Sequence, residues 1–304
     1  IRIITLLINL VQCLLVLPVL RVSFRIKRAV MRPLLSLGGW MTVTNVVSPL
    51  MVSLDRFFIG AIISVSAVAY YTTPFEAVTK LWTIPFSLTG VLFPAFAVSF
   101  LTDANRASKL FARGVKYIFL CLFPIILLIV AFSHEGLNLW LGEEFAQNST
   151  RVLQLLAIGV LINSLAHIPF SYIQSAGRPD LTAKLHLVEL PLYLVAVWWV
   201  VGAFGIVGVA LVWTIRITVD AVAMFLISRI FLKQGLMIGR NTILIGAGSL
   251  LALACTTLPL NTLLKVVMVA MFLMVFTAAA WFIIFDQSER AMVQKRLRIA
   301  HVLK

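Results

Sequence analysis

The chain has 304 residues, of which 62% are hydrophobic and only 12% are charged, and its mean hydropathy is +1.06. A soluble domain of this size cannot hide so much apolar surface, so this composition excludes one. Apolar runs of about 20 residues recur along the chain, and each is long enough to cross a hydrocarbon core about 30 Å thick. Because the runs are continuous rather than alternating, they predict an all-α polytopic membrane helical bundle and not a barrel.

The formal net charge of +14 raises the question of a nucleic-acid partner, but the positions of the basic residues argue against one. Of 25 Lys and Arg residues, 19 fall in connecting stretches between apolar runs or in the C-terminal tail. Basic residues at the ends of membrane segments set the orientation of those segments. We therefore expect membrane lipids, and no nucleic acid, around this chain.

The apolar runs predict about nine transmembrane helices, and the connections between them alternate between basic and non-basic. The segments lie at about 3–20, 34–63, 74–100, 117–133, 151–175, 185–202, 206–230, 242–258 and 263–285. By the positive-inside rule, the basic connections and the basic tail are cytoplasmic, and residue 1 is on the outer side. No connection exceeds about 17 residues, so the function is expected between the helices or at their ends.

The charge pattern also divides the chain into units. Six segments, within residues 34–230, lie between two basic stretches and form one unit. Residues 1–33 would be one helix and a basic cytoplasmic linker, and 231–304 two additional helices and the basic tail. Because the chain begins with Ile1 inside an apolar run, and one odd helix precedes the unit, we expect that an upstream bundle is missing.

The apolar hairpin between residues 34 and 94 carries four charges that sum to zero: Asp55, Arg56, Glu76 and Lys80. A charge in hydrocarbon costs about 2.5–3.5 kcal/mol on insertion scales, so such residues usually pair or face water. Asp55 and Glu76 are about equally far from the hairpin tip. We therefore expect Arg56 to meet Glu76, and Asp55 to meet Lys80, near the outer face. These ion pairs would either lock the hairpin or act as an outer gate or rim.

Arg216 and Asp220 lie four residues apart in the segment 206–230, so they share a helix face. Arg216 is about 15 Å from the outer end of this helix, near the membrane midplane. Its permanently charged guanidinium fork suits phosphate or carboxylate. Two interpretations remain open, an anion-binding group that faces a hydrated cavity and an internal pair with Asp220 that only holds the fold.

Other polar residues inside predicted spans are further candidates. Glu189 and His186 approach the depth of Asp220, where a carboxylate beside an imidazole would carry a proton or, alternatively, cap the helix at the interface. Asn45 and Asn163 would line a polar cavity or hydrogen-bond a neighbouring helix.

Enzyme signatures are absent from the sequence, which contains no GxSxG, P-loop, HExxH or CxxC motif. The three cysteines lie in apolar runs without metal-ligand spacing and are interpreted as packing residues. We therefore expect neither an enzyme nor a metal site. Asp103 is expected to cap the amphipathic stretch that follows it, ANRASKLFARGVKY.

Four blocks of the sequence resemble a known family. They are GGWMTVTNVVSPLMVSLDRFFIG at 38–60, AYYTTPFEAVTKLWTIPFSLTGVLFPAF at 69–96, the stretch 140–194 that begins WLGEEFAQNST, and GIVGVALVWTIRITVDA at 205–221. In combination these blocks resemble the O-antigen type of polysaccharide flippase in the multidrug/oligosaccharidyl-lipid/polysaccharide exporter superfamily.

The resemblance implies two six-helix lobes around a central cavity, with 34–230 as the second lobe and 242–285 as an extra helix pair. Members move undecaprenyl-diphosphate-linked oligosaccharides across the bacterial inner membrane by alternating access. Cavity charges engage the anionic headgroup, a role that Arg216 fits best. The superfamily couples transport to proton or sodium gradients, and no other cofactor is implied. The implied partners are the lipid-linked oligosaccharide, the missing first lobe and a polysaccharide polymerase.

Three other functions stay open. A multidrug or cation exporter of the same superfamily would favour acidic and aromatic residues over an arginine in its cavity. A membrane glycosyltransferase or polymerase would need a long outer loop with catalytic charges, whereas the connection 134–150 is short. A chain without its first lobe would be an inactive fragment.

Overall fold

The computed structural model describes residues 2–19, 28–232, 240–258, 261–285, 287 and 289–291. Within these ranges the chain forms helices and contains no strand, so the predicted all-α class is confirmed. Residues 21–27 of the predicted basic linker 21–33 and the tail beyond residue 291, both predicted to be cytoplasmic, lie outside the described residues, whereas residues 28–33 begin α2.

The helices follow one another with short connections. They are α1 (Arg2–Val19), α2 (Arg28–Ile62), α3 (Val65–Thr79), the short 3-10 turn η1 (Lys80–Trp82), α4 (Thr83–Thr102), α5 (Ala104–Ala131), α6 (Ser133–Leu141), α7 (Glu143–Ser175), α8 (Pro179–Phe231), α9 (Arg240–Thr256), α10 (Thr262–Ala279) and the π turn η2 (Ala280–Ile284).

Each predicted span falls on helical chain, although the span 74–100 covers the end of α3, the turn η1 and α4 rather than one helix. Six helical stretches of the described chain are long and apolar enough to cross a membrane, and the longest of them is α8 with 53 residues. Helices α3, η1 and α4 together form one such stretch, from Val65 to Phe100. The predicted helix cap at Asp103 is confirmed. Its carboxylate accepts hydrogen bonds from the backbone N–H groups of Asn105 and Arg106 at the start of α5.

Helix α8 is a hairpin of two spans joined at Gly205. This residue has φ 59° and ψ −153°, a conformation that costs little only for glycine. Beyond the turn, a Cβ atom on Gly208 would lie 2.5 Å from Cγ1 of Val200, so glycine is also needed for the two halves to approach. The turn falls in the predicted link at 203–205. It brings residues near 186–193 of the first half opposite residues near 216–220 of the second.

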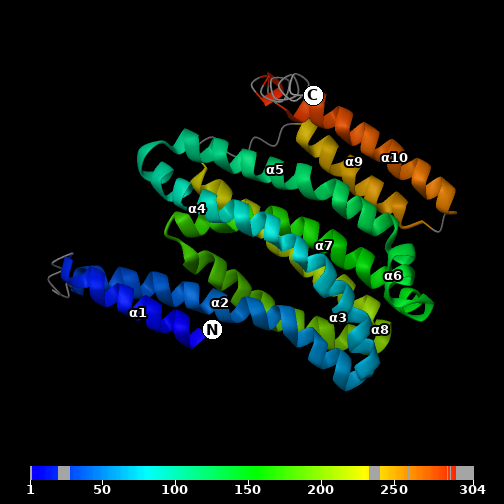
Figure 1. Cartoon of the computed structure of the whole chain (residues 1–304), viewed down its shortest axis with the longest axis horizontal. Coiled ribbons are helices and arrows are strands. Elements are labelled where there is room, and N and C mark those ends of the chain that lie inside the picture. Colours follow the sequence, from blue (N-terminus) through cyan, green and yellow to red (C-terminus); the bar gives the residue numbers. More distant parts are fainter. Residues whose placement is uncertain are drawn as a thin grey trace.

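Helix α7 runs through the centre of the bundle, where it contacts α3, α4, α5, α6 and α8 (Figure 1). Its buried side chains join a core of large residues from the other helices, among them Tyr71, Phe96, Phe123 and Trp213. Helices α1 and α2 lie at one edge of the molecule and α9 and α10 at the opposite edge, beyond α5 (Figure 1). The α2 helix packs mainly on α8, and this contact contains most of the buried charges.

Helix α10 is fastened at both of its ends. The Lys265 ammonium donates to Oε1 of Glu135 on α6 at 2.8 Å. Beyond the other end and the turn η2, Oε1 of Glu289 accepts hydrogen bonds from Lys116 at 2.7 Å and from Tyr117 at 2.6 Å, both on α5. These contacts hold the last helix of the described chain against the α5–α6 unit.

The Glu135–Lys265 pair is expected to make this attachment sensitive to acid. Partial burial alone raises the pKa of the Glu135 carboxyl, but the hydrogen bonds from Lys265 and a backbone N–H hold its pKa below the ordinary value of 4.5. A lowered folded-state pKa gives stability that is present above the unfolded value and is lost as the pH falls through the folded value. Between pH 6 and pH 3 the melting temperature should lose no more than about 3 °C from this pair. Thermal unfolding of Glu135→Gln should lack this component, and an identical pH profile in the variant would contradict the assignment.

Candidate functional site

Four of the residues singled out in the sequence meet in one buried cluster between the two halves of α8. They are His186, Glu189, Arg216 and Asp220, which we call the α8 cluster, and their side chains are at most 10% exposed. One ligand atom each from His186, Glu189 and Asp220 lie within 4.8 Å of one another. The predicted common depth of these three residues is thus found in the fold, and it follows directly from the turn at Gly205.

The imidazole of His186 connects the α8 cluster to α2. Its Nε2 atom lies 3.4 Å from Oδ1 of Asp220, and its Nδ1 atom lies 3.2 Å from the Ser48 hydroxyl on α2. The ring of Phe170 on α7 stacks on the imidazole at a centroid distance of 6.2 Å. The imidazole therefore has a polar partner on each nitrogen and sits at the junction of α2, α7 and α8.

Arg216 pairs with Glu189, and not with Asp220 as one sequence interpretation proposed. Its Nη1 atom lies 3.6 Å from Oε2 of Glu189 and 3.3 Å from Sδ of Met51 on α2. The guanidinium also lies over the Tyr193 ring, 5.4 Å from the centroid. The reason is geometric, since the antiparallel half of α8 places Glu189 opposite the guanidinium. Arg216 is therefore held on one side by a ring and on the other by a single carboxylate.

Asp55 occupies a different place from the predicted outer rim. Its side chain is fully buried, and its Oδ2 accepts hydrogen bonds from the hydroxyls of Tyr71 at 2.6 Å and Tyr193 at 3.2 Å. The expected contact with Lys80 is not formed, because Asp55 faces the buried Tyr71 and Tyr193 whereas the side chain of Lys80 is exposed. Through Tyr193, Asp55 is connected to Arg216 instead.

The other expected pair of the hairpin is present but loose. Nη1 of Arg56 lies 3.9 Å from Oε1 of Glu76, and the two side chains are 26% and 63% exposed. The Arg56 guanidinium also lies 5.1 Å from the centre of the Phe75 ring. An exposed pair of this kind contributes about 0–1 kcal/mol, so it adds little to stability, and its role as a gate or rim stays a prediction.

Two predicted cavity residues lie apart from the α8 cluster. Asn45 is exposed on α2, and Asn163 is half-buried on α7. Conversely, the sequence reasoning missed Tyr71 and Tyr193, which connect Asp55 to the rest of the site. A tyrosine in an apolar run is interpreted as a packing residue. Its role as a hydrogen-bond donor becomes visible only when the fold places a buried carboxylate within reach of its hydroxyl.

The α8 cluster has more buried acids than bases. Arg216 supplies one positive charge, whereas Glu189 and Asp220 supply two negative charges, so the cluster carries −1 when His186 is neutral. Both Glu189 oxygens and Oδ1 of Asp220 are buried without a hydrogen-bond partner. Because an uncompensated buried charge costs several kcal/mol, the cluster favours one further monovalent positive charge. A proton on the carboxylates or imidazole supplies it, and so does a sodium ion between the oxygens.

Comparison with known proteins shows relatives in polysaccharide biosynthesis. Residues 2–150 match a family described as polysaccharide biosynthesis proteins. A putative O-antigen transporter of Shigella flexneri is 38% identical over 184 residues, which are 60% of this chain and 44% of the relative. The lipopolysaccharide biosynthesis protein WzxC of Escherichia coli is 26% identical over 182 residues, 59% of this chain and 36% of the relative. An uncharacterized membrane protein of Methanocaldococcus jannaschii is 23% identical over 189 residues, 60% of this chain and 36% of the relative.

The helical bundle and these matches define a multi-pass membrane protein. More narrowly, the chain is similar to a putative O-antigen transporter and to a lipopolysaccharide biosynthesis protein, which agrees with the resemblance seen in the sequence blocks. The first relative is named as a transporter, in agreement with the expectation that this chain is not an enzyme. The matched region spans less than half of the length of each relative.

Proposed function

We propose that this chain is part of a transporter that flips undecaprenyl-diphosphate-linked oligosaccharide across the bacterial inner membrane by alternating access. The names of the two bacterial relatives support the substrate class. The observation that carries the proposal is the buried Arg216, whose guanidinium fork suits a diphosphate. Within the described part of the chain it pairs with a single carboxylate, that of Glu189 at 3.6 Å.

The charge balance of the α8 cluster determines how such a headgroup binds. A diphosphate adds about two negative charges to a cluster that already carries −1 with a neutral His186. Arg216 therefore exchanges Glu189 for the diphosphate, and the acids left behind take up a proton. His186 and Glu189 are the proton-coupling residues in this scheme, and Asp220 keeps the imidazole in place. Substrate binding and proton uptake become linked by the same buried charges.

The proposed arrangement assigns a place to each part of the chain. Residues 34–230 form the second six-helix lobe, 1–33 provide the last helix of the first lobe with a cytoplasmic linker, and 231–304 add two helices and a cytoplasmic tail. The first lobe completes the cavity beside α2 and α8, and a polysaccharide polymerase receives the flipped unit. We call this chain together with its first lobe the complete transporter.

The orientation of the helices gives a direct prediction. With the three native cysteines replaced by alanine, Asn138→Cys on α6 should react with a membrane-impermeant maleimide in intact spheroplasts. Arg229→Cys, exposed at the end of α8, should react only after the membrane is permeabilised. The reason is the positive-inside rule, which places the basic connections in the cytoplasm. The reverse labelling pattern would show that the orientation is wrong.

A cation exporter is the second candidate, and one observation favours it. Asp55, Glu189 and Asp220 are three buried acids that face one buried arginine and several aromatic rings, an environment that suits a cation. Proteoliposomes of the complete transporter separate the two functions. The proposal expects flipping of a radiolabelled diphosphate-linked oligosaccharide and no uptake of a cationic dye. Dye transport without any sugar-lipid flipping would replace the proposed function by the second one.

A further inference from the structure

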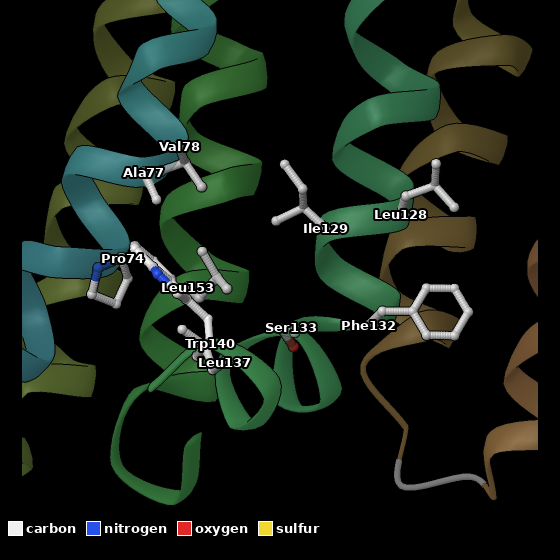
Figure 2. Close-up of a pocket in the computed structure, with 11 residues that line it drawn as sticks. Pro74, Ala77, Val78, Leu128, Ile129, Phe132, Ser133, Leu137, Trp140 and Leu153 are labelled. Carbon is white, nitrogen blue, oxygen red and sulfur yellow. The ribbon is translucent and has the colours of Figure 1, made fainter. Parts of the chain in front are cut away.

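A pocket of about 380 Å³ opens on the side of the bundle between α3 and α5 (Figure 2). Its floor consists of buried side chains, Val78 of α3, Leu137 of α6 and Leu153 of α7. Its rim is exposed, with Leu128 of α5 at 43% and Trp140 of α6 at 62%. None of the lining residues belongs to α2 or α8, so the pocket is separate from the α8 cluster.

The lining of the pocket selects a hydrocarbon ligand. Apart from Ser133, every lining side chain is aliphatic or aromatic or belongs to glycine or proline. The Ser133 hydroxyl donates to the carbonyl of Val130 at 3.1 Å, so its hydrogen-bond donor already has an acceptor within the protein. Apart from the indole N–H of Trp140 on the exposed rim, these side chains offer a polar ligand no hydrogen bond in return for its lost hydration, whereas an apolar chain gains contact with the floor.

The depth of the pocket matches one leaflet of a bilayer. Leu153 is ten residues beyond Glu143 at the start of α7, or about 15 Å along the helix axis. This is about half of a 30 Å hydrocarbon core. At its shallow end the pocket is closed by α6, whose exposed Leu139 (92%) and Trp140 (62%) are typical of a helix at the membrane interface. The pocket thus runs from the interface toward the midplane.

Acidic residues lie on and directly after α6, the helix that closes the shallow end. Glu135 is neutralised by Lys265, but Glu143 and Glu144 begin α7 in exposed positions. The partners of these two acids are neutral or weakly basic. The Tyr70 hydroxyl donates to Glu144 at 2.8 Å, the Gln147 amide donates to Glu143 at 2.9 Å, and Nε2 of His134 lies 3.6 Å from Glu143. The mouth of the pocket is therefore net negative. It repels the headgroup of an anionic lipid and attracts an ammonium group.

We propose that this pocket binds one acyl chain of an amine-bearing phospholipid, phosphatidylethanolamine in a bacterial membrane, with its ammonium facing Glu143 and Glu144. The lipid seals the gap between α3 and α5 and supports α6 from below. A polyprenyl diphosphate is a poor occupant because its headgroup would meet the two carboxylates. The site does not depend on the transport function proposed above.

Gly136 offers a way to fill the pocket without disturbing the helices. It lines the pocket on α6, and a Cβ atom placed on it would meet nothing within 4 Å. Gly136→Leu should therefore occupy the space of the acyl chain. Gly90→Leu is the matched control, because Gly90 has the same free space on α4 and does not line the pocket. Ala77→Leu, which enters from α3, serves as a second filling variant.

Native mass spectrometry of the purified chain would measure retention of phosphatidylethanolamine, phosphatidylglycerol and undecaprenyl phosphate. In the unmodified chain, phosphatidylethanolamine should be retained in preference to the two anionic lipids. Its retention should fall at least tenfold in Gly136→Leu and Ala77→Leu and stay unchanged in Gly90→Leu. The double variant Glu143→Gln/Glu144→Gln should reduce the preference over phosphatidylglycerol by about fivefold or more, since a charge near a headgroup contributes about 1 kcal/mol.

Two results would overturn the proposal. Unchanged phosphatidylethanolamine retention in both filling variants, with melting temperatures equal to that of the Gly90→Leu control, would show that the pocket is not the lipid site. Equal or stronger retention of undecaprenyl phosphate in the unmodified chain, lost in Gly136→Leu and Ala77→Leu, would show that the acidic mouth does not select the headgroup.

Discussion

Replacing Arg216 by alanine is expected to reduce flipping of a lipid-linked oligosaccharide by the complete transporter at least 100-fold. The guanidinium is the one cation of the α8 cluster, and its removal takes away the fork that binds the diphosphate. Arg216→Lys should keep a small part of the activity, because an ammonium supplies the charge but neither the fork nor the stacking on Tyr193. The measurement is the initial rate of flipping in proteoliposomes at equal protein content.

A stability control separates a lost binding group from a lost fold. Arg216→Ala leaves two carboxylates without their cation, a change that typically costs about 3–5 kcal/mol for a buried pair. The double variant Arg216→Met/Glu189→Gln removes one charge of each sign and should recover most of the melting temperature. It should not recover flipping. Normal flipping by Arg216→Ala at normal expression would show that Arg216 does not bind the substrate.

The second large effect is expected at Asp55. Asp55→Ala removes the common acceptor of two buried tyrosine hydroxyls, Tyr71 at 2.6 Å and Tyr193 at 3.2 Å. An unsatisfied buried donor costs about 1–3 kcal/mol, so the variant should lose about 2–6 kcal/mol of stability. Thermal unfolding or limited proteolysis of the chain in detergent measures this loss.

Glu76→Ala is the matched control for Asp55, since both acids belong to the same charged hairpin. Glu76 is 63% exposed and lies 3.9 Å from its partner, so its removal should change stability by less than about 1 kcal/mol. Equal effects of Asp55→Ala and Glu76→Ala would mean that Asp55 is an interfacial residue, as depth counting along the sequence suggested. The structure predicts a clear difference between them.

The length and spacing of apolar runs indicate where helices begin, end and reverse direction. Apolar run lengths predicted the spans, and the short link before Gly205 predicted the reversal that brings Glu189 to the depth of Arg216. Depth alone could not say which way a side chain points around its helix. For this reason the sequence offers Asp220, four residues away on the same helix, as the only ion-pair partner considered in one of the two open interpretations of Arg216, whereas the opposing half of α8 supplies the partner.

The hairpin charges show the same limit. Counting from the tip predicts Asp55 at the outer face beside Lys80, and that pairing is wrong because Asp55 points into the bundle toward Tyr71 and Tyr193, whereas Lys80 is exposed. No sequence pattern predicts the 3-10 turn at Lys80–Trp82. Nor does one show that Tyr193, in an otherwise apolar run, joins Asp55 to Arg216. Such connections depend on side-chain packing between helices that are distant in the sequence.

The central claim is that the diphosphate binds at the α8 cluster and that a proton is taken up with it. Isothermal titration of undecaprenyl diphosphate into the complete transporter, repeated in two buffers with different ionisation enthalpies, counts these protons. The account predicts uptake of about one proton per bound lipid. It predicts no uptake in Glu189→Gln, whose amide cannot take the proton. Binding of equal affinity without proton uptake in the unmodified protein would contradict it.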